Sequence, residues 1–96
     1  MSGVYSGETG KERELENHLR SLFPKVKQEA GVEEYILHSA KSTPGKFFFY
    51  EKYKDRQVLE CHMNTAYLKE AFGKFEELVS GEPQVELYEI VDSIAD

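Results

Sequence analysis

Residues 46–53, KFFFYEKY, are the strongest strand signal in the chain, because four consecutive aromatic residues are dense in β-formers. The segment 42–45, STPG, is typical of a turn. Before it, Val32 to Ala40 also has the pattern of a strand. The sequence therefore predicts an antiparallel β-hairpin at the centre of the fold.

A strand and a helix are expected before this hairpin. Val4 to Ser6 predicts a short strand, and Thr9 with Glu12 fits a capping box that starts a helix. That helix carries an apolar stripe and should end at Gly31, with Pro24 kinking or shortening its last turn. The stripe consists of Leu15, Leu19, Leu22, Phe23 and Val26.

A helix and a strand are expected after the hairpin. Asp55 is a candidate N-cap for a second helix, which should break and restart at Asn64 or Thr65. Gln84 to Val91 predicts a final strand. The order β-α-β-β-α-β is the ferredoxin-like arrangement, an α+β fold with a four-stranded antiparallel sheet and helices on one face.

The predicted strands have two apolar faces. In Phe47-Phe48-Phe49-Tyr50 both alternating sets of side chains are aromatic, and the last strand is apolar on both sides too. A bare aromatic sheet face would be unusual on a monomer. The pattern predicts a homodimer whose subunits pack through the open sheet face.

Length and composition limit the function classes. The 96 residues, 11.1 kDa in mass, suit one small domain over 1–96, and a net charge of −6 from 12 basic and 18 acidic residues disfavours nucleic-acid and anionic-membrane binding. The single cysteine, Cys61, permits no intrachain disulfide, and no apolar run reaches the length of a membrane span. We expect a cytoplasmic protein without membrane contact.

His62 is the first candidate for chemistry, because its helical position turns it toward the sheet, where an imidazole can act as a base. From pattern alone, a core histidine bonded to a backbone carbonyl is the stronger reading. His38 reads as a surface or sheet-edge residue, and Cys61 as a buried inert thiol. The histidines lack metal-ligand spacing, so no metal is expected.

Five tyrosines could line an aromatic pocket for a flat ligand, with their hydroxyl groups as polar contacts. For most of them, core packing or a dimer interface is the alternative that the pattern favours. They are Tyr35, Tyr50, Tyr53, Tyr67 and Tyr88.

Several segments together resemble the antibiotic biosynthesis monooxygenase (ABM) family, from about residue 9 to 91. Gly31 to His38 resembles the family's G-C-x-x-Y-x-x-H strand, with Val32 in place of Cys. Phe48 to Arg56 resembles its F-x-x-Y-E-x-W-x-D segment, with Tyr53 in place of Trp. Leu59 to Met63 falls where the family has L-x-x-H-x.

This resemblance implies a dimeric α+β barrel and, as in the YgiN-like quinol monooxygenases, oxidation of a quinol or polyphenol-type aromatic by O₂ without a cofactor. It implies a base or orienting role for His62, which matches the family's helix histidine. Tyr50, Glu51 and Tyr53 match the strand motif. The residues expected to contact the small aromatic substrate are Tyr50, Glu51, Tyr53, Tyr67, Phe49 and Phe72.

Two alternatives remain. One is a related isomerase-like enzyme of the autoinducer-processing branch, acting on a small polar metabolite. The other is a dimeric ligand-binding or stress-response module without turnover. Basic side chains in the pocket would favour the polar metabolite, because phosphate needs them. An apolar aromatic lining would favour the oxygenase, and a pocket filled by Phe and Tyr side chains would favour the binding module.

Overall fold

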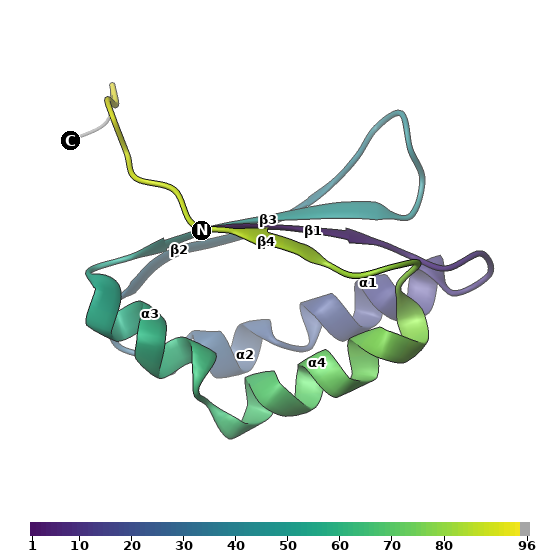
Figure 1. The fold of residues 1–96 in the computed structure, drawn as a ribbon, viewed down its shortest axis with the longest axis horizontal. Coiled ribbons are helices and arrows are strands. Elements are labelled where there is room, and N and C mark those ends of the chain that lie inside the picture. Colours follow the sequence, from purple (N-terminus) through teal and green to yellow (C-terminus); the bar gives the residue numbers. More distant parts are fainter. Residues whose placement is uncertain (95–96) are drawn as a thin grey trace.

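The computed structural model describes residues 1–94 and has the predicted βαββαβ order, with each predicted helix divided into two. The sheet order is β2-β3-β1-β4, and all neighbouring strands are antiparallel. The helices cover one face of this sheet (Figure 1). The elements are β1 (Ser2–Ser6), α1 (Glu12–Arg20), α2 (Phe23–Val26), β2 (Val32–Ser39), β3 (Lys46–Tyr53), α3 (Arg56–Met63), α4 (Ala66–Leu78) and β4 (Gln84–Glu86).

Strand β3 has the predicted bounds and both of the predicted faces. Phe47 and Phe49 are buried against the helices, whereas Phe48, between them, is 38% exposed on the open face. The buried face packs on a core that α1 and α4 complete from below. Its most deeply buried apolar side chains are Phe49, Phe75, Leu15, Leu19 and Leu78.

The first helical segment departs from the prediction at its start. Helix α1 begins at Glu12, and the cap position is Lys11, so the expected Thr9 cap is wrong. Gly10 adopts a positive φ of 87°, and its amide donates to Glu12 Oε1 at 2.8 Å. The Glu12 carboxylate therefore binds the Gly10 amide within this turn, and not the Thr9 amide as a capping box at Thr9 would require.

The same segment is interrupted near Pro24. Helix α1 ends at Arg20, and α2 begins at Phe23 with Pro24 in its first turn. At that position the missing proline N–H removes no helical hydrogen bond. Pro24 therefore starts a new short helix, where a kinked or shortened last turn of one helix was expected. Helix α2 ends at Val26, so the expected end at Gly31 is wrong.

The final strand is shorter than predicted. Strand β4 ends at Glu86, which is paired with Ser2, the first residue of β1. Beyond that point β1 offers no partner, so residues 87–91 leave the sheet and rise on the side opposite the helices (Figure 1). Apolar side chains there are exposed, Val91 by 96%.

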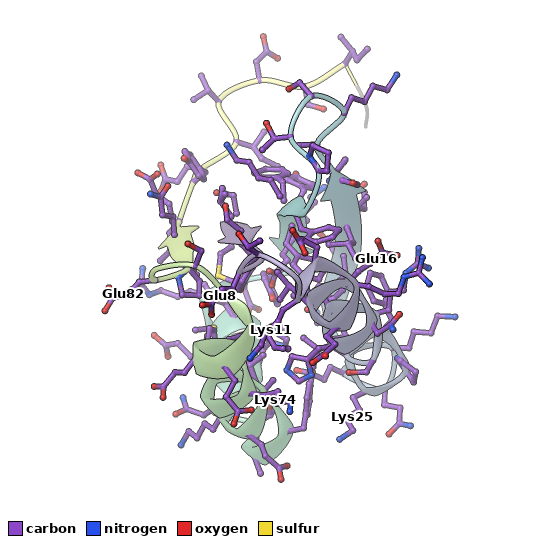
Figure 2. All side chains as sticks on the ribbon, turned by 90° about the vertical axis from the view of Figure 1, so that its right-hand side faces the viewer. Glu8, Lys11, Glu16, Lys25, Lys74 and Glu82 are labelled. Carbon is purple, nitrogen blue, oxygen red and sulfur yellow. The ribbon has the colours of Figure 1, made fainter. Side chains whose placement is uncertain are left out.

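The outer surface of the helical layer is charged. Figure 2 shows Glu16, Lys25 and Lys74 projecting outward from α1, α2 and α4. These faces are solvated, as their composition predicts. Within residues 1–94, no helix has both the length and the apolar character needed to cross a bilayer.

Candidate functional site

His62 lies between the sheet and α3, with a side chain that is 1% exposed. Asp55 caps the helix as predicted, its Oδ1 accepting from the Val58 amide at 2.9 Å. This start sets the rotation of α3, so that His62, one turn after Val58, faces the sheet. Both ring nitrogens of His62 face carboxylates. The sequence pattern favoured a core histidine bonded to a backbone carbonyl, but the neighbours of the ring nitrogens are two acids.

Glu29 is the first of these acids, and it comes from the loop between α2 and β2. Its Oε2 lies 2.9 Å from His62 Nδ1 and also accepts a hydrogen bond from the Tyr67 hydroxyl. Because an ionised carboxylate only accepts, Nδ1 carries the hydrogen and Nε2 is left as an acceptor. Glu29 therefore fixes the tautomer of His62.

Sequence reasoning missed Glu29, although one signal was present. Glu29 follows Lys25 and Lys27 at the end of a helical segment, where the helix dipole disfavours an acid. An acid in that position suggests a tertiary partner. Because Glu29 and His62 are 33 residues apart in the sequence, the pattern could not identify His62 as that partner.

Glu51 is the second acid, on the helix-facing side of β3. Its Oε1 lies 3.8 Å from His62 Nε2 and accepts a hydrogen bond from the Tyr53 hydroxyl. Burial raises the pKa of the Glu51 carboxyl above its ordinary value, while the hydrogen bond from Tyr53 acts in the opposite direction. A carboxylate with a raised pKa is a stronger base than one in water.

Three tyrosine rings surround His62. The ring centroids of Tyr53, Tyr35 and Tyr67 lie 5.4, 6.2 and 6.3 Å from that of the imidazole. Burial, followed by the charge of Glu51, raises the pKa of the Tyr35 and Tyr53 hydroxyls. For Tyr67, burial is followed by the hydrogen bond to Glu29. All three phenols are therefore neutral near pH 7, and those of Tyr53 and Tyr67 donate to the carboxylates.

A cavity of about 930 Å³ lies beside Glu51 and Tyr53, between the end of β3, α3 and residues 87–92. Its volume suits a drug-sized ligand, since such pockets span roughly 300–1,000 Å³. Its aromatic and aliphatic lining is Phe48, Tyr50, Tyr53, Tyr88, Leu59, Leu87 and Ile90. His62 is not in the lining, because Glu51 and Tyr53 stand between it and the cavity.

The charges around this larger cavity are mixed and mainly negative. Lys52 and Arg56 are its two cationic side chains, and each lies near a carboxylate outside the lining, Glu33 at 3.9 Å and Glu60 at 3.4 Å. The Met1 ammonium also lines the cavity and donates to the Glu51 backbone carbonyl at 2.9 Å. The four acids of the lining are Glu51, Asp55, Glu89 and Asp92. The electrostatics of the cavity therefore suit a neutral or weakly acidic ligand better than a phosphate.

A smaller cavity of about 470 Å³ lies beside Glu29, the partner of His62 Nδ1, and shares Asp55 with the larger cavity. Glu29, Asp55 and Cys61 belong to its lining. Cys61 is exposed, so the expectation of a buried thiol is wrong. Cys61 and His62 are neighbours on α3, and their side chains point about 100° apart. Because His62 faces the core, Cys61 faces outward.

The residues expected to contact substrate fall into three places. Glu51, Tyr53 and Tyr67 lie together around His62, and Tyr50 lines the larger cavity from the outer face of β3. Phe49 is a core residue. Phe72 packs against Phe75, with ring centroids 5.4 Å apart, and lines neither cavity.

His38 lies on the edge strand β2, exposed, as the sequence predicts. Over residues 1–94, no group of three or more His, Cys, Asp and Glu side chains is arranged to hold a metal ion.

Comparison with known proteins places this chain in a family. Three similar solved structures are proteins of Caulobacter crescentus, Pseudomonas aeruginosa and Mycobacterium tuberculosis. Their identities are 27, 26 and 17%, and their TM-scores are 0.86, 0.82 and 0.90. The alignments cover 95, 94 and 98% of this chain and 87, 91 and 95% of the other chains.

The third of these likenesses, at 17% identity, supports the fold alone. No curated protein matches the chain. The family model for antibiotic biosynthesis monooxygenases matches residues 3–91, nearly the whole sequence. The chain therefore belongs to the antibiotic biosynthesis monooxygenase family.

Proposed function

We propose that the protein is a cofactor-independent monooxygenase that oxidises a quinol or polyphenol-type aromatic with O₂. The observation that carries this proposal is the position of Glu51. Its carboxyl group is buried beside His62 and at the same time forms part of the wall of an aromatic cavity. A buried base next to an aromatic cavity is what the oxidation of a phenol requires from the protein.

The chemistry begins with removal of a phenolic proton, because a phenolate is electron-rich enough to pass an electron to O₂. Glu51, in its ionised form, accepts that proton at the cavity wall. His62 receives it at Nε2, the nitrogen that the Glu29 contact leaves as an acceptor, once substrate binding closes the 3.8 Å between Nε2 and Glu51 Oε1 to hydrogen-bond distance. The base role expected for His62 is thus exerted through Glu51, and a preorganised pair of this kind needs no large rearrangement during reaction.

The overall reaction balances without another reactant. One quinol and one O₂ give one hydroxyquinone and one water. One oxygen atom of O₂ enters the ring, and the other leaves as water with two hydrogens that the quinol has lost. No proton is released or consumed overall.

The polar-metabolite alternative is less well supported. A phosphorylated substrate needs unpaired cationic side chains. In the larger cavity, Lys52 and Arg56 lie beside Glu33 and Glu60, and acids outnumber cations in the lining. The binding-module alternative differs from the oxygenase only in turnover, so an activity measurement separates them.

The deciding experiment is oxygen consumption by chelator-treated protein with a panel of reduced quinols and anthrones. We expect consumption above the autoxidation rate. His62→Asn should lower it by about 100-fold, within the range for loss of a general base. His38→Asn is the matched control, because His38 is exposed on β2, and it should keep the wild-type rate.

Two results would contradict the proposed reaction, and a third would contradict the role of His62. Wild-type consumption at the autoxidation rate across the panel would favour the binding module. Activity that chelation abolishes and one metal restores would contradict the cofactor-independent mechanism. Equal rates in wild type and His62→Asn would remove His62 from the mechanism.

We also propose that the protein is a homodimer through the open sheet face. Proteins of this family are typically dimeric. Ile36 and Phe48 are exposed on that face by 43 and 38%, and the apolar residues after Glu86 rise on the same side. A partner there would also cover the larger cavity and exclude water from it.

Light scattering tests the dimer. We expect twice the chain mass of 11.1 kDa at micromolar concentration, and the monomer mass for Ile36→Lys. A charge at this position would be buried without a partner in the interface, which is strongly unfavourable. Ile36 lines neither cavity. A wild-type mass near that of one chain would rule out the dimer.

A further inference from the structure

A line of titratable side chains runs between the two cavities. Glu51 lines the larger cavity and Glu29 lines the smaller one. His62 lies between them, with Nε2 facing Glu51 at 3.8 Å and Nδ1 facing Glu29 at 2.9 Å. The two carboxylates thus approach opposite nitrogens of one imidazole ring.

Exposure changes along this line of side chains. The side chains of Glu51 and His62 are 5 and 1% exposed, whereas that of Glu29 is 17% exposed. The group farthest from the proposed substrate cavity is therefore the one in contact with solvent. A proton that reaches Glu29 can exchange with water in the smaller cavity.

The outer groups of the line are held by hydroxyl donors. Tyr53 donates to Glu51, and Tyr67 donates to Glu29. Lys25 lies over the Tyr67 ring, 5.5 Å from its centroid. Tyrosine rings enclose the imidazole of His62. Proton transfer to or from its nitrogens therefore needs less space than a flip of the imidazole ring.

We propose that Glu51, His62 and Glu29 form a two-way proton relay between the substrate cavity and the smaller cavity, with Glu29 as its solvent-facing end. This inference rests on the proposed oxidation of a phenol at Glu51. Glu29 acts through His62 and is a positioning and relay residue, because it does not touch the substrate.

The relay balances in both directions. On the outward path, Glu51 passes the phenolic proton to Nε2, and Nδ1 passes its own proton to Glu29. On the return path, Glu29 gives a proton to Nδ1, and Nε2 returns one to Glu51 for the water that forms from O₂. The charge and the proton count of the cluster are then restored.

The return path explains how a buried histidine can work repeatedly. After one outward transfer, His62 holds the other tautomer and would have to turn over before a second transfer in the same direction. Reversal of the path restores the first tautomer without any ring motion. A reaction with no net proton release therefore suits a histidine whose ring is locked.

The first test does not depend on turnover. It measures exchange of the His62 ring N–H with water by ¹⁵N NMR, for wild type, Glu29→Gln and the exposed-surface control Glu76→Gln. Loss of the acidic relay group should slow exchange by about tenfold or more in Glu29→Gln and leave the control unchanged. If Glu29 only supported the structure, its loss would loosen the site and speed exchange, which would overturn the relay.

A second variant covers a failure to fold. Glu29→Asp keeps an acid in the same place, so its exchange rate should stay within about threefold of wild type if an acid is what matters. An exchange rate in Glu29→Asp as slow as in Glu29→Gln would overturn the relay.

The kinetic test uses the active protein with its best quinol. Glu29→Ala should lower kcat by about 10- to 100-fold with little change in KM, and added formate should restore part of kcat by supplying a carboxylate in the space left. Glu29→Gln should lower kcat equally and show no response to formate. Equal kcat in wild type and Glu29→Ala, or no rescue by formate, would contradict the relay.

The two proposals can fail separately. Wild-type protein that consumes no oxygen overturns the proposed function, and the NMR exchange rates still decide whether Glu29 connects His62 to solvent. Wild-type turnover with unchanged exchange in Glu29→Gln overturns the relay and leaves the oxygenase proposal intact.

Discussion

Strand β3 passes from an apolar half of the core into a polar half, and the two halves differ in what they contribute. Its first helix-facing residues, Phe47 and Phe49, pack among apolar groups such as Tyr5, whose ring lies 6.0 Å from that of Phe49. Its next two, Glu51 and Tyr53, face His62. Apolar burial stabilises a fold, whereas buried charges do so weakly or not at all. The first half therefore holds the fold, and the second half carries the proposed chemistry.

The largest effect on stability is expected in the apolar half. Phe75 is 2% exposed and contacts the rings of Tyr5, His18 and Phe72, with centroids 4.9 to 5.4 Å away. Phe75→Ala leaves a cavity among them and should lower the free energy of unfolding by about 3–5 kcal/mol. Urea denaturation measures this. A loss under about 1 kcal/mol would mean that the apolar half does not carry the stability.

A smaller effect on stability is expected at Gly31, in the turn that follows Glu29 and positions it beside His62. Gly31 adopts a φ of 90°, and a Cβ there would lie 2.6 Å from Val58 Cγ2. Gly31→Ala therefore combines an unfavourable backbone conformation with a clash against α3, and should cost about 2–3 kcal/mol.

The same denaturation experiment tests it, with Gly73→Ala as the control. Gly73 lies within α4, and a Cβ there meets nothing within 4 Å. Replacing glycine inside a helix should stabilise the protein by up to about 1 kcal/mol. Equal effects of the two substitutions would show that the turn at Gly31 is not constrained.

The polar half should reveal itself in the pH dependence of stability. Burial raises the pKa of Glu51 in the folded state, so the folded protein holds this proton to a higher pH than the unfolded chain does. The resulting stability is fully present below the ordinary carboxyl value of 4.5 and is lost as the pH rises through the folded value. Glu51→Gln should remove this decline.

The measurement is the free energy of unfolding between about pH 4 and pH 8, compared for wild type and Glu51→Gln. Glu34→Gln, at an exposed position of β2, is the control and should keep the wild-type slope. If wild type and Glu51→Gln had the same slope, Glu51 would not hold its proton more tightly in the fold.

The sequence predicted the apolar half better than the polar half. Phe47 to Tyr50 alternate between two apolar faces, and that local pattern determines a strand whatever surrounds it. The partner of His62 could not be predicted in this way, because Glu29 reaches it through the loop between α2 and β2. The early end of β4 depends on where β1 stops offering partners, which is a property of the sheet and not of residues 84–91.

The smallest effect concerns the cap that orients His62. Asp55 Oδ1 accepts from the Val58 amide, and Asp55→Ala should cost about 1 kcal/mol, the usual value for a lost N-cap. Asp55→Ser keeps an acceptor at the cap and should restore most of the stability. Because α3 is only eight residues long, loss of its cap should also loosen the rotation that keeps His62 inward.

The His62 ring signals in the ¹⁵N NMR spectrum report that rotation separately from stability. In Asp55→Ala they should broaden or move toward the positions of a solvated imidazole, and in Asp55→Ser they should stay at their wild-type positions. Unchanged signals in Asp55→Ala would mean that the Glu29 contact alone holds the ring. In that case the polar half would be organised by its own hydrogen bonds, independently of the helix that delivers the histidine.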